Sequence, residues 1–489
     1  MIIIAIIFAL YLALMVWIGV KNYSKTDSLT DYILGGRKLN SWVTAMSAQA
    51  SDMSGWLLIG LPGTAYVIYT GTQEAIWTAI GLWLGTYLNW LFVAKRLRKY
   101  TFISGNSITL PDFFENRFRD KKHVLRVVSG VFIVVFFLVY TSSQYAAGGK
   151  LFNTIFGINY TTGLIIGAVI ILAYTALGGF NAVCLTDTIM GITMFIALIV
   201  VPIVAVIRMD GMSGLETRLA ELTPEELGFV PKAGGHINTL LLASSLGWGL
   251  GYFGQPHILA RFMGIESPDE IRKSRVIAMV WVTVTLAAAI AVGVIGKALL
   301  PSLNDPETVY MTMINSMFNP VVAGLLMTAI LAAIMSTASS QLLVSAASVS
   351  RDIYATLFKK NVEGPEIVWA SRFTVAIVSI IAILLALNPD SSVFDLVSCA
   401  WGGFGAAFGP LILFSLFWRR MTLPGAIAGM ITGGVVDLVW YNLHGGIFEL
   451  YEIIPGCISA AVVIIVVSLC TSVSKEITDE FDSVKTAKF

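Results

Sequence analysis

The sequence predicts an all-α membrane protein that crosses the bilayer about 13 times. Three observations support this prediction: an apolar composition, a series of long apolar runs, and an uneven distribution of basic residues. Of the 489 residues, 56% are hydrophobic and 12% are charged, and that charged share is about half that of a soluble domain. So few charges could not cover the surface of a soluble protein of this length. We therefore do not expect a soluble enzyme, a coiled coil or a disordered chain.

Thirteen apolar runs are long enough to cross a bilayer, since a spanning helix needs about 20 mostly apolar residues. These runs are centred near residues 11, 55, 83, 136, 170, 195, 249, 287, 333, 377, 405, 432 and 463. The longest connecting segments, roughly 95–123 and 209–235, are too short for a separate catalytic domain. No basic residue precedes the first run and no cleavage site follows it, so we expect a span rather than a cleaved signal.

The basic residues predict the orientation of the chain. If the N-terminus lies outside, 26 of the 31 lysines and arginines fall in inside loops or in the C-terminal tail. Such an excess is typical of cytoplasmic loops. The pattern supports both the number of spans and a topology with the N-terminus outside and the C-terminus in the cytoplasm. The net charge is +1 and no basic block stands out, so we do not expect a nucleic-acid partner.

Two of the runs are interrupted near their centres. The run 42–68 contains the small, polar and acidic segment Ala50–Gly55, and the run 240–262 contains four closely spaced glycines followed by Pro256. Glycine and proline both weaken a helix at such positions. For either helix alone, an ordinary kink packed on its neighbours is an alternative. The two runs lie five spans apart and so enter from opposite sides, which predicts an inverted repeat with a transport site near the midplane.

We accordingly expect one membrane transporter domain, 1–489. Its expected parts are an extra N-terminal helix with its inner loop (1–39), a first repeat (40–208), a second repeat (236–418), two peripheral helices (419–474) and a cytoplasmic tail (475–489).

Polar residues inside these spans indicate a cation site. Asp52 lies at mid-membrane, where a charge costs about 2.5–3.5 kcal/mol on insertion scales and is usually functional; capping of the broken helix is the alternative. Ser336 and Thr337 place hydroxyls on another span. Hydroxyls and unwound carbonyls together form an oxygen cage that suits a monovalent cation. A divalent ion would need several carboxylates. For Ser339 and Ser340, helix packing is the favoured interpretation.

Aromatic residues indicate a ligand cavity beside the broken helices. Trp248, Tyr252 and Pro256 recur at i, i+4 and i+8 and would share one helix face. With Tyr140 and Trp56 they suit a small ligand that has an apolar body and a charged head, whose carboxylate could sit at a half-helix N-terminus. Lipid or interface contact is the usual role of such residues. Asp187, early in the sixth span, is either a relay near a cation exit path or a capping or snorkelling residue.

The chain resembles the sodium/solute symporter family over roughly residues 30–470, and most closely its bacterial sodium/proline branch. The motifs are ILGGRKL at 33–39, ASDMSGW at 50–56, GGFNAV at 178–183 with Thr186–Asp187, GWGLGYFGQPHILARFM at 247–263, MST at 335–337 and FGAAFGP at 404–410. The resemblance implies 13 helices, a LeuT-like core of five plus five helices, sodium as the co-transported ion, and the plasma membrane of a bacterial cell.

The resemblance also implies roles for individual residues. Sodium ligands would be the carbonyls of Ala50, Met53 and Ala333 and the hydroxyls of Ser336 and Thr337. Substrate binding or its coupling would involve Ser54, Gly55, Trp56, Tyr140, Trp248, Tyr252 and Pro256. Coupling to sodium would depend on Asp52 and Asp187.

The leading hypothesis is a secondary transporter that imports L-proline with sodium by alternating access. Another small amino acid, or a carboxylate such as pantothenate, remains the alternative substrate. A channel would show a polar stripe or a carbonyl-lined loop, a membrane enzyme would show a nucleophile–base pair or metal cluster, and a sensor would carry a signalling domain; none is evident in the sequence. The expected partners are proline, sodium and the lipid bilayer, with no obligate protein partner.

Overall fold

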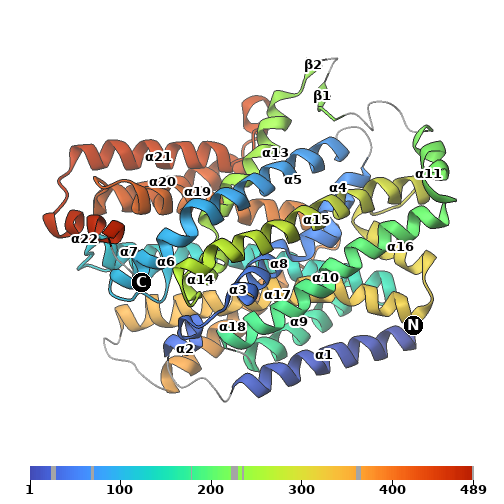
Figure 1. The fold of residues 1–489 in the computed structure, drawn as a ribbon, viewed down its shortest axis with the longest axis horizontal. Coiled ribbons are helices and arrows are strands. Elements are labelled where there is room, and N and C mark those ends of the chain that lie inside the picture. The colour runs from blue at the N-terminus through green and yellow to red at the C-terminus, as the bar shows by residue number, and fades with distance from the viewer. Residues whose placement is uncertain are drawn as a thin grey trace.

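The computed structural model describes residues 1–23, 29–67, 71–177, 179–221, 229–233, 236–358 and 365–486. Within these ranges the chain is almost entirely helical, and most long helices run side by side along one direction (Figure 1). Nine of the described helices are long and apolar enough to cross a membrane. The all-α membrane class predicted from the sequence is therefore confirmed.

The first half of the chain forms a helical bundle that begins at the N-terminus. Its elements are α1 (Ile2–Tyr23), α2 (Leu29–Leu34), η1 (Gly35–Arg37), α3 (Ser41–Gly55), η2 (Trp56–Gly60), α4 (Leu61–Tyr66), α5 (Gly71–Leu88), η3 (Asn89–Val93), α6 (Ala94–Ile103), α7 (Leu110–Phe118), α8 (Val124–Phe156), α9 (Tyr160–Leu177), α10 (Phe180–Arg208) and α11 (Gly211–Leu219). Side-chain caps fix two helix starts: Asn40 accepts from the Val43 N–H before α3, and Thr109 accepts from the Asp112 N–H before α7.

The second half follows a two-stranded hairpin, in which β1 (Lys232–Ala233) pairs antiparallel with β2 (His236–Ile237). Its helices are α13 (Thr239–Gly251), η4 (Tyr252–Gly254), α14 (Pro256–Gly264), η5 (Pro268–Glu270), α15 (Ile271–Leu299), η6 (Pro306–Thr308), α16 (Val309–Met317), α17 (Pro320–Ala347), η7 (Ser348–Ala355), α18 (Pro365–Leu385), α19 (Val393–Phe417), α20 (Leu423–Tyr441), η8 (Gly446–Glu449), α21 (Ile453–Cys470) and α22 (Lys475–Thr486).

Both predicted helix interruptions are present. In the first, Ser54 has φ 49° and ψ −172°, which turns the chain out of the helical path at the end of α3 before η2 continues it. In the second, Gln255 is extended (φ −77°, ψ 109°) between η4 and α14. Pro256 then begins α14, where its missing N–H costs no helical hydrogen bond.

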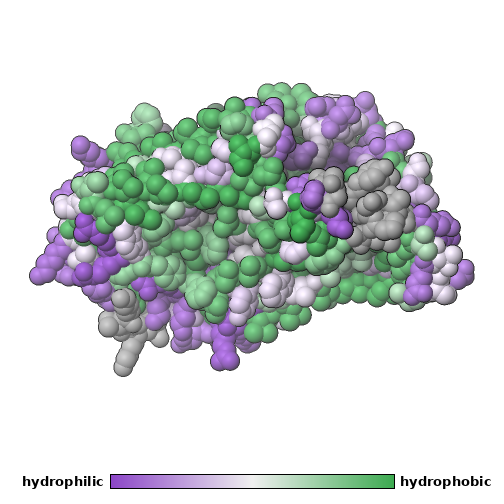
Figure 2. All heavy atoms as spheres, turned by 90° about the horizontal axis from the view of Figure 1, so that it is seen from above, coloured by the Kyte–Doolittle hydropathy of each residue, from purple (hydrophilic) through white to green (hydrophobic). Residues whose placement is uncertain are grey.

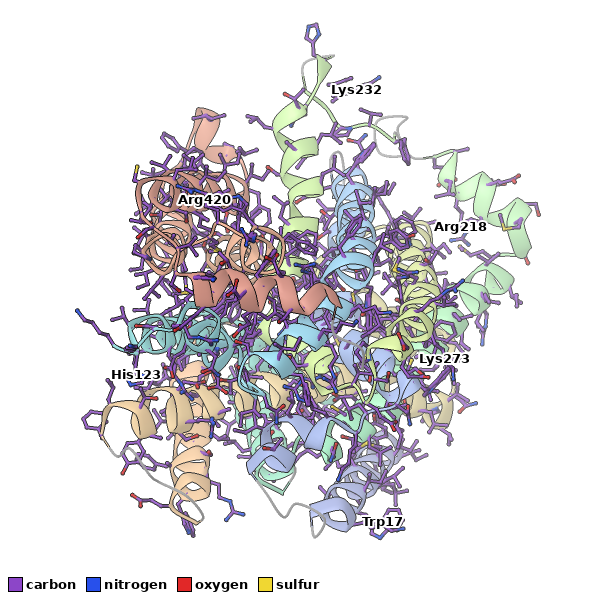
Figure 3. The ribbon with its side chains drawn as sticks, turned by 60° about the vertical axis from the view of Figure 1, so that its left-hand side comes forward. Trp17, His123, Arg218, Lys232, Lys273 and Arg420 are labelled. Atoms are coloured by element: carbon purple, nitrogen blue, oxygen red, sulfur yellow. The ribbon has the colours of Figure 1, made fainter. Side chains whose placement is uncertain are left out.

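The surface matches a membrane setting. Apolar residues cover the middle of the molecule and polar residues gather toward its two ends (Figure 2). The N-terminus lies at the end that carries α11, and α22 lies at the opposite end (Figure 1). Figure 3 likewise shows Arg218 and Lys232, on α11 and β1, apart from His123 and Arg420. Each of the thirteen expected centres falls in a helix. The number of spans, the inverted repeat and the domain limits remain predictions.

The interrupted helix α3–η2 lies in the interior of the bundle. It contacts α10, α14, α15 and α17. Most of α17 is buried inside the protein, whereas α1 is mostly exposed. A helix that is surrounded by other helices can leave its backbone ladder unmade without exposing polar groups to lipid.

Candidate functional site: a broken helix facing two hydroxyls

The hydroxyls of α17 lie against the carbonyl groups of α3 one turn before the break. Ser336 Oγ donates to the Ala50 carbonyl oxygen at 2.8 Å and to the Ala333 carbonyl oxygen at 3.2 Å. Thr337 Oγ1 donates to the same Ala50 oxygen at 3.5 Å. All four residues are fully buried. Four of the five expected cation ligands therefore meet at one point, although 283 or more residues separate Ala50 from the other three in sequence.

The backbone groups freed by the break have other partners. The Trp56 N–H donates to the carbonyl oxygens of Met53 and Ser54 and to the Ser54 hydroxyl, the last at 3.1 Å. The Gly55 N–H donates to Gln144 Oε1 on α8 at 3.0 Å. The fifth expected ligand, the Met53 carbonyl, thus lies within the irregular turn rather than in a regular helical ladder. Ser54 and Gly55 form the turn itself.

Asp52 joins the two interrupted helices. The Tyr252 hydroxyl, on η4, donates to the Asp52 carboxylate. The Tyr140 hydroxyl, on α8, donates to the Asp52 backbone carbonyl at 3.1 Å. The Asp52 side chain is almost completely buried. One tyrosine hydroxyl thus holds the Asp52 carboxylate and another holds its backbone carbonyl, which places this residue between α3, η4 and α8.

Aromatic rings surround a small cavity next to Asp52. The ring centroids of Trp56 and Trp248 are 5.4 Å apart in a stacked arrangement, and Trp401 packs edge-on against Tyr252 at 5.3 Å. The cavity has a volume of about 10 Å³ and is lined by Asp52, Met53, Trp56, Leu82, Tyr140, Trp248, Val397 and Trp401. This space holds at most one water molecule. The site is thus closed around its own side chains.

One polar atom at this cavity lacks a partner. The indole Nε1 of Trp56 is buried and makes no hydrogen bond to any described residue. A buried N–H donor without an acceptor is unfavourable by about 1–3 kcal/mol. The arrangement therefore favours a ligand that presents an acceptor such as a carboxylate oxygen.

Pro256 lies away from this cavity. The sequence pattern placed it on one helix face with Trp248 and Tyr252, but the extended Gln255 breaks that helix, so the expected shared face is wrong. Pro256 instead lines a second cavity of about 30 Å³ with residues of α7, α8, α14 and α17. Its role in substrate binding remains a prediction.

Asp187 forms a buried ion pair. Arg261 Nη2, on α14, lies 3.2 Å from Asp187 Oδ2, and both side chains are fully buried. The Ser47 hydroxyl on α3 donates to Asp187 Oδ2 at 2.7 Å, and Arg261 Nη2 donates to Ser340 Oγ on α17 at 2.5 Å. Four helices, α3, α10, α14 and α17, are therefore linked at this cluster. Ser47 lies nearer than Asp52 to the start of α3. The cluster is therefore displaced from the Asp52 site toward the end of the molecule where α2 and α14 lie.

A wider cavity opens on the opposite side of the aromatic rings. Its volume is about 500 Å³, and Phe394 lines it while also packing on Trp248 with centroids 5.0 Å apart. Its charged lining residues are Glu74, Lys150, Asp305, Glu307, Asp390 and Asp395. Lys150 Nζ lies 2.7 Å from Glu307 Oε2. We call this wider cavity the vestibule. Its excess of carboxylates over basic residues attracts cations.

The sequence analysis did not identify three residues of this site. Gln144 accepts the free Gly55 N–H, Trp401 lines the closed cavity, and Arg261 pairs with Asp187. Gln144 and Arg261 carried one usable signal, because a polar or charged residue within an apolar run is usually functional. Trp401 carried none, since its position beside Trp248 depends on how α19 packs against α13.

The comparisons with known proteins agree with this geometry. A model of the "Sodium:solute symporter family" matches residues 32–433. The chain is 46% identical over 481 residues to a sodium/proline symporter of Staphylococcus aureus (strain bovine RF122 / ET3-1), covering 95% of this chain and 92% of the relative. It is also 46% identical over 473 residues to the high-affinity proline transporter PutP of Bacillus subtilis (strain 168), covering 96% and 98%.

Solved structures support the same fold. A substrate-bound, outward-open Na⁺-coupled sialic acid symporter superposes with a TM-score of 0.78 at 20% identity, covering 97% of this chain and 99% of that one. The transporter MhsT, solved with L-phenylalanine, superposes with a TM-score of 0.54 at 16% identity, covering 88% and 97%. The family inferred from the motifs, and with it the transporter rather than enzyme class, is confirmed. This multi-pass membrane protein belongs to the sodium:solute symporter family.

Proposed function

We propose that this chain imports L-proline together with sodium. Two observations support the proposal: the names of the two relatives at 46% identity, and the contact of Ser336 and Thr337 with the Ala50 carbonyl at the helix break. The second observation carries the mechanism, because it brings neutral oxygens from two distant helices to one point. A cation bound there would tie α3 to α17.

The sodium ligands would be five neutral oxygens. They are the carbonyls of Ala50, Met53 and Ala333 and the hydroxyls of Ser336 and Thr337. Each hydroxyl would rotate its hydrogen away from Ala50 and present a lone pair to the ion. A cage without a carboxylate binds sodium weakly enough for release, which a transport cycle requires.

Proline would bind in the aromatic cavity, which must widen from its volume of about 10 Å³. The rings of Trp56, Trp248 and Tyr252 would pack on the pyrrolidine ring, and the unpaired Trp56 Nε1 would donate to the carboxylate. Asp52, adjacent to both the cage and the cavity, would couple the two ligands, since its carboxylate and its carbonyl are held by different helices.

The difference between the open and closed sides of the site supports transport by alternating access. The vestibule reaches the aromatic rings from one side, while the Asp187–Arg261 cluster holds four helices together on the other. The basic-residue pattern supports an extracellular vestibule and a cytoplasmic Arg261 side. Sodium entry would supply about 2.3 kcal/mol per 100 mV of membrane potential, before any concentration gradient.

Uptake of labelled proline into vesicles tests this function. We expect saturable uptake that requires an inward sodium gradient and is absent in an Asp52→Asn variant. A panel of small amino acids and pantothenate, each tested as a competitor with and without sodium, identifies the substrate. Strong competition by another compound, with none by proline, would reject proline; uptake that is independent of sodium would reject the coupling.

A further inference from the structure

Two acidic side chains lie against the same glycine in the interior, outside the proposed transport site. Asp437 lies on α20, and Glu452 immediately precedes α21; their exposed fractions are 0% and 9%. Both face Gly402 on α19. A Cβ atom at Gly402 would stand 3.1 Å from Asp437 Oδ1 and 3.4 Å from Glu452 Oε1. The absence of a side chain at Gly402 therefore makes room for the two carboxyl groups.

Asp437 has unmet hydrogen-bonding capacity. Both of its carboxylate oxygens are buried and make no hydrogen bond to any described residue. A buried carboxylate without a partner is strongly unfavourable, so such a group is either protonated or bound to a cation. The missing hydrogen bonds of Asp437 therefore indicate a bound ligand. This evidence is independent of the proximity of Asp437 to a second acid.

No compensating positive charge faces the pair in the described part of the chain. The titratable groups that interact with the pair from the surrounding elements are Asp395 and Cys399 on α19, Tyr441 at the end of α20, Tyr451 before α21, and Cys457 on α21. All are acidic or neutral. Two carboxylates that share an apolar site cannot both ionise without a large repulsion. One proton held between them removes that repulsion.

A proton fits this site better than a metal ion. Groups of three or more His, Cys, Asp or Glu residues that could hold a metal are absent from the described chain. Burial raises the pKa of the Glu452 carboxyl to about 7, so it titrates within the range that a cell surface experiences. Glu452 is also slightly exposed, which gives the proton a route from water.

The pair adjoins two residues that cover the substrate cavity. Tyr451, next to Glu452, packs on Trp248 with ring centroids 5.6 Å apart. Trp401, next to Gly402, donates from Nε1 to the Trp248 carbonyl at 2.8 Å. A displacement of Glu452 therefore moves a ring that rests directly on Trp248.

We propose that Asp437 and Glu452 form a proton-binding carboxyl pair that sets the position of the aromatic cover over the substrate cavity. A proton from the aqueous phase binds one carboxylate oxygen and is hydrogen-bonded to the other acid. When it leaves, the two carboxylates repel each other, Glu452 shifts toward water, and Tyr451 loosens from Trp248. The effect on transport rests on the proposed function, whereas proton binding does not.

Infrared difference spectroscopy of the full-length protein in lipid vesicles tests proton binding directly. A pH titration from 5 to 9 should show the C=O band of a protonated carboxyl disappearing around neutral pH. Asp437→Asn and Glu452→Gln should each remove one component of that titrating band. Glu449→Gln is the matched control, because Glu449 lies in the same loop but is exposed. A titrating band of unchanged amplitude in both variants, or a missing component that responds to sodium at fixed pH instead of to pH, would overturn the proposal.

Proline uptake then tests the consequence. The half-saturating proline concentration of the unmodified protein should change between pH 6 and pH 8, where a site of pKa about 7 changes its proton occupancy by about tenfold. In Glu452→Gln this change should be lost, while Glu449→Gln keeps it. If the half-saturating proline concentration depends equally on pH in the unmodified protein, Glu452→Gln and Glu449→Gln, the carboxyl pair does not control the aromatic cover. Absent proline uptake with an intact titrating band rejects the proposed substrate and leaves the proton site standing.

Discussion

The Ser336→Ala variant gives the sharpest test of the sodium cage. Ser336 Oγ is the atom that lies 2.8 Å from the Ala50 carbonyl and 3.2 Å from the Ala333 carbonyl, so it is central to the expected ligands. Alanine removes that oxygen and keeps the helix, since it is the best helix former. The site is fully buried, so water does not readily replace the lost ligand.

The expected effect follows from the energy of one such contact. A polar contact to a charged group contributes about 1.5–3 kcal/mol. Because about 1.4 kcal/mol corresponds to a tenfold change in affinity, the half-saturating sodium concentration should rise between about tenfold and about 100-fold. The assay is initial labelled-proline uptake over a sodium titration at constant ionic strength. The maximal uptake rate at saturating sodium should fall by a smaller factor than the apparent affinity for sodium.

Ser339→Ala is the matched control. Ser339 lies on the same helix and is equally buried, but its hydroxyl donates to the Ser336 carbonyl of its own helix at 3.2 Å. We expect its sodium dependence to stay near that of the unmodified protein. If Ser336→Ala leaves the sodium titration unchanged, or if Ser339→Ala shifts it equally, the hydroxyls do not bind the ion.

Four further outcomes are expected. Tyr252→Phe keeps the ring against Trp401 but removes the hydroxyl that binds Asp52, so the half-saturating proline concentration should rise by about tenfold or more; an effect on sodium alone would contradict this. Asp52→Asn should abolish sodium-dependent proline uptake while sparing expression, as judged by immunoblot of the membrane fraction. Arg261→Gln leaves a buried carboxylate unpaired at a cost of about 3–5 kcal/mol, so thermal unfolding in detergent should occur at a lower temperature, and adding Asp187→Asn should restore part of the loss; no recovery would argue against the pair. The raised pKa of Glu452 means that its folded form binds protons more tightly than its unfolded form, so stability should fall as the pH rises from about 4.5 through about 7, and Glu452→Gln should flatten that profile of thermal unfolding.

Much of the site could be predicted from the sequence because a membrane makes polar residues conspicuous. Lipid cannot satisfy a charge or a freed backbone group, so Asp52, the broken runs and the hydroxyls of Ser336 and Thr337 stand out against apolar surroundings. The motifs then assign the family. The structure brings Ser336 and Thr337 to Ala50, as the cation-cage hypothesis requires.

Other contacts depend on packing between helices that the local pattern does not encode. The i, i+4, i+8 spacing assumed an unbroken helix, and Gln255 separates Pro256 from Trp248 because its backbone is extended. The acids Asp437 and Glu452 are not among the residues that the sequence analysis identified. Both face Gly402, a glycine on a third helix whose missing side chain leaves space beside them.

The amino-acid sequence by itself determined the class, the interrupted helices and the chemistry of the expected ligands, since each of these follows from the cost of placing a given residue in lipid. Only the tertiary structure decided which distant side chains share a cavity, which charges are paired, and that the aromatic cavity beside Asp52 is closed in this conformation. Helix packing is set by the complementary shapes of whole faces, and such complementarity is a property of pairs of helices rather than of either one alone.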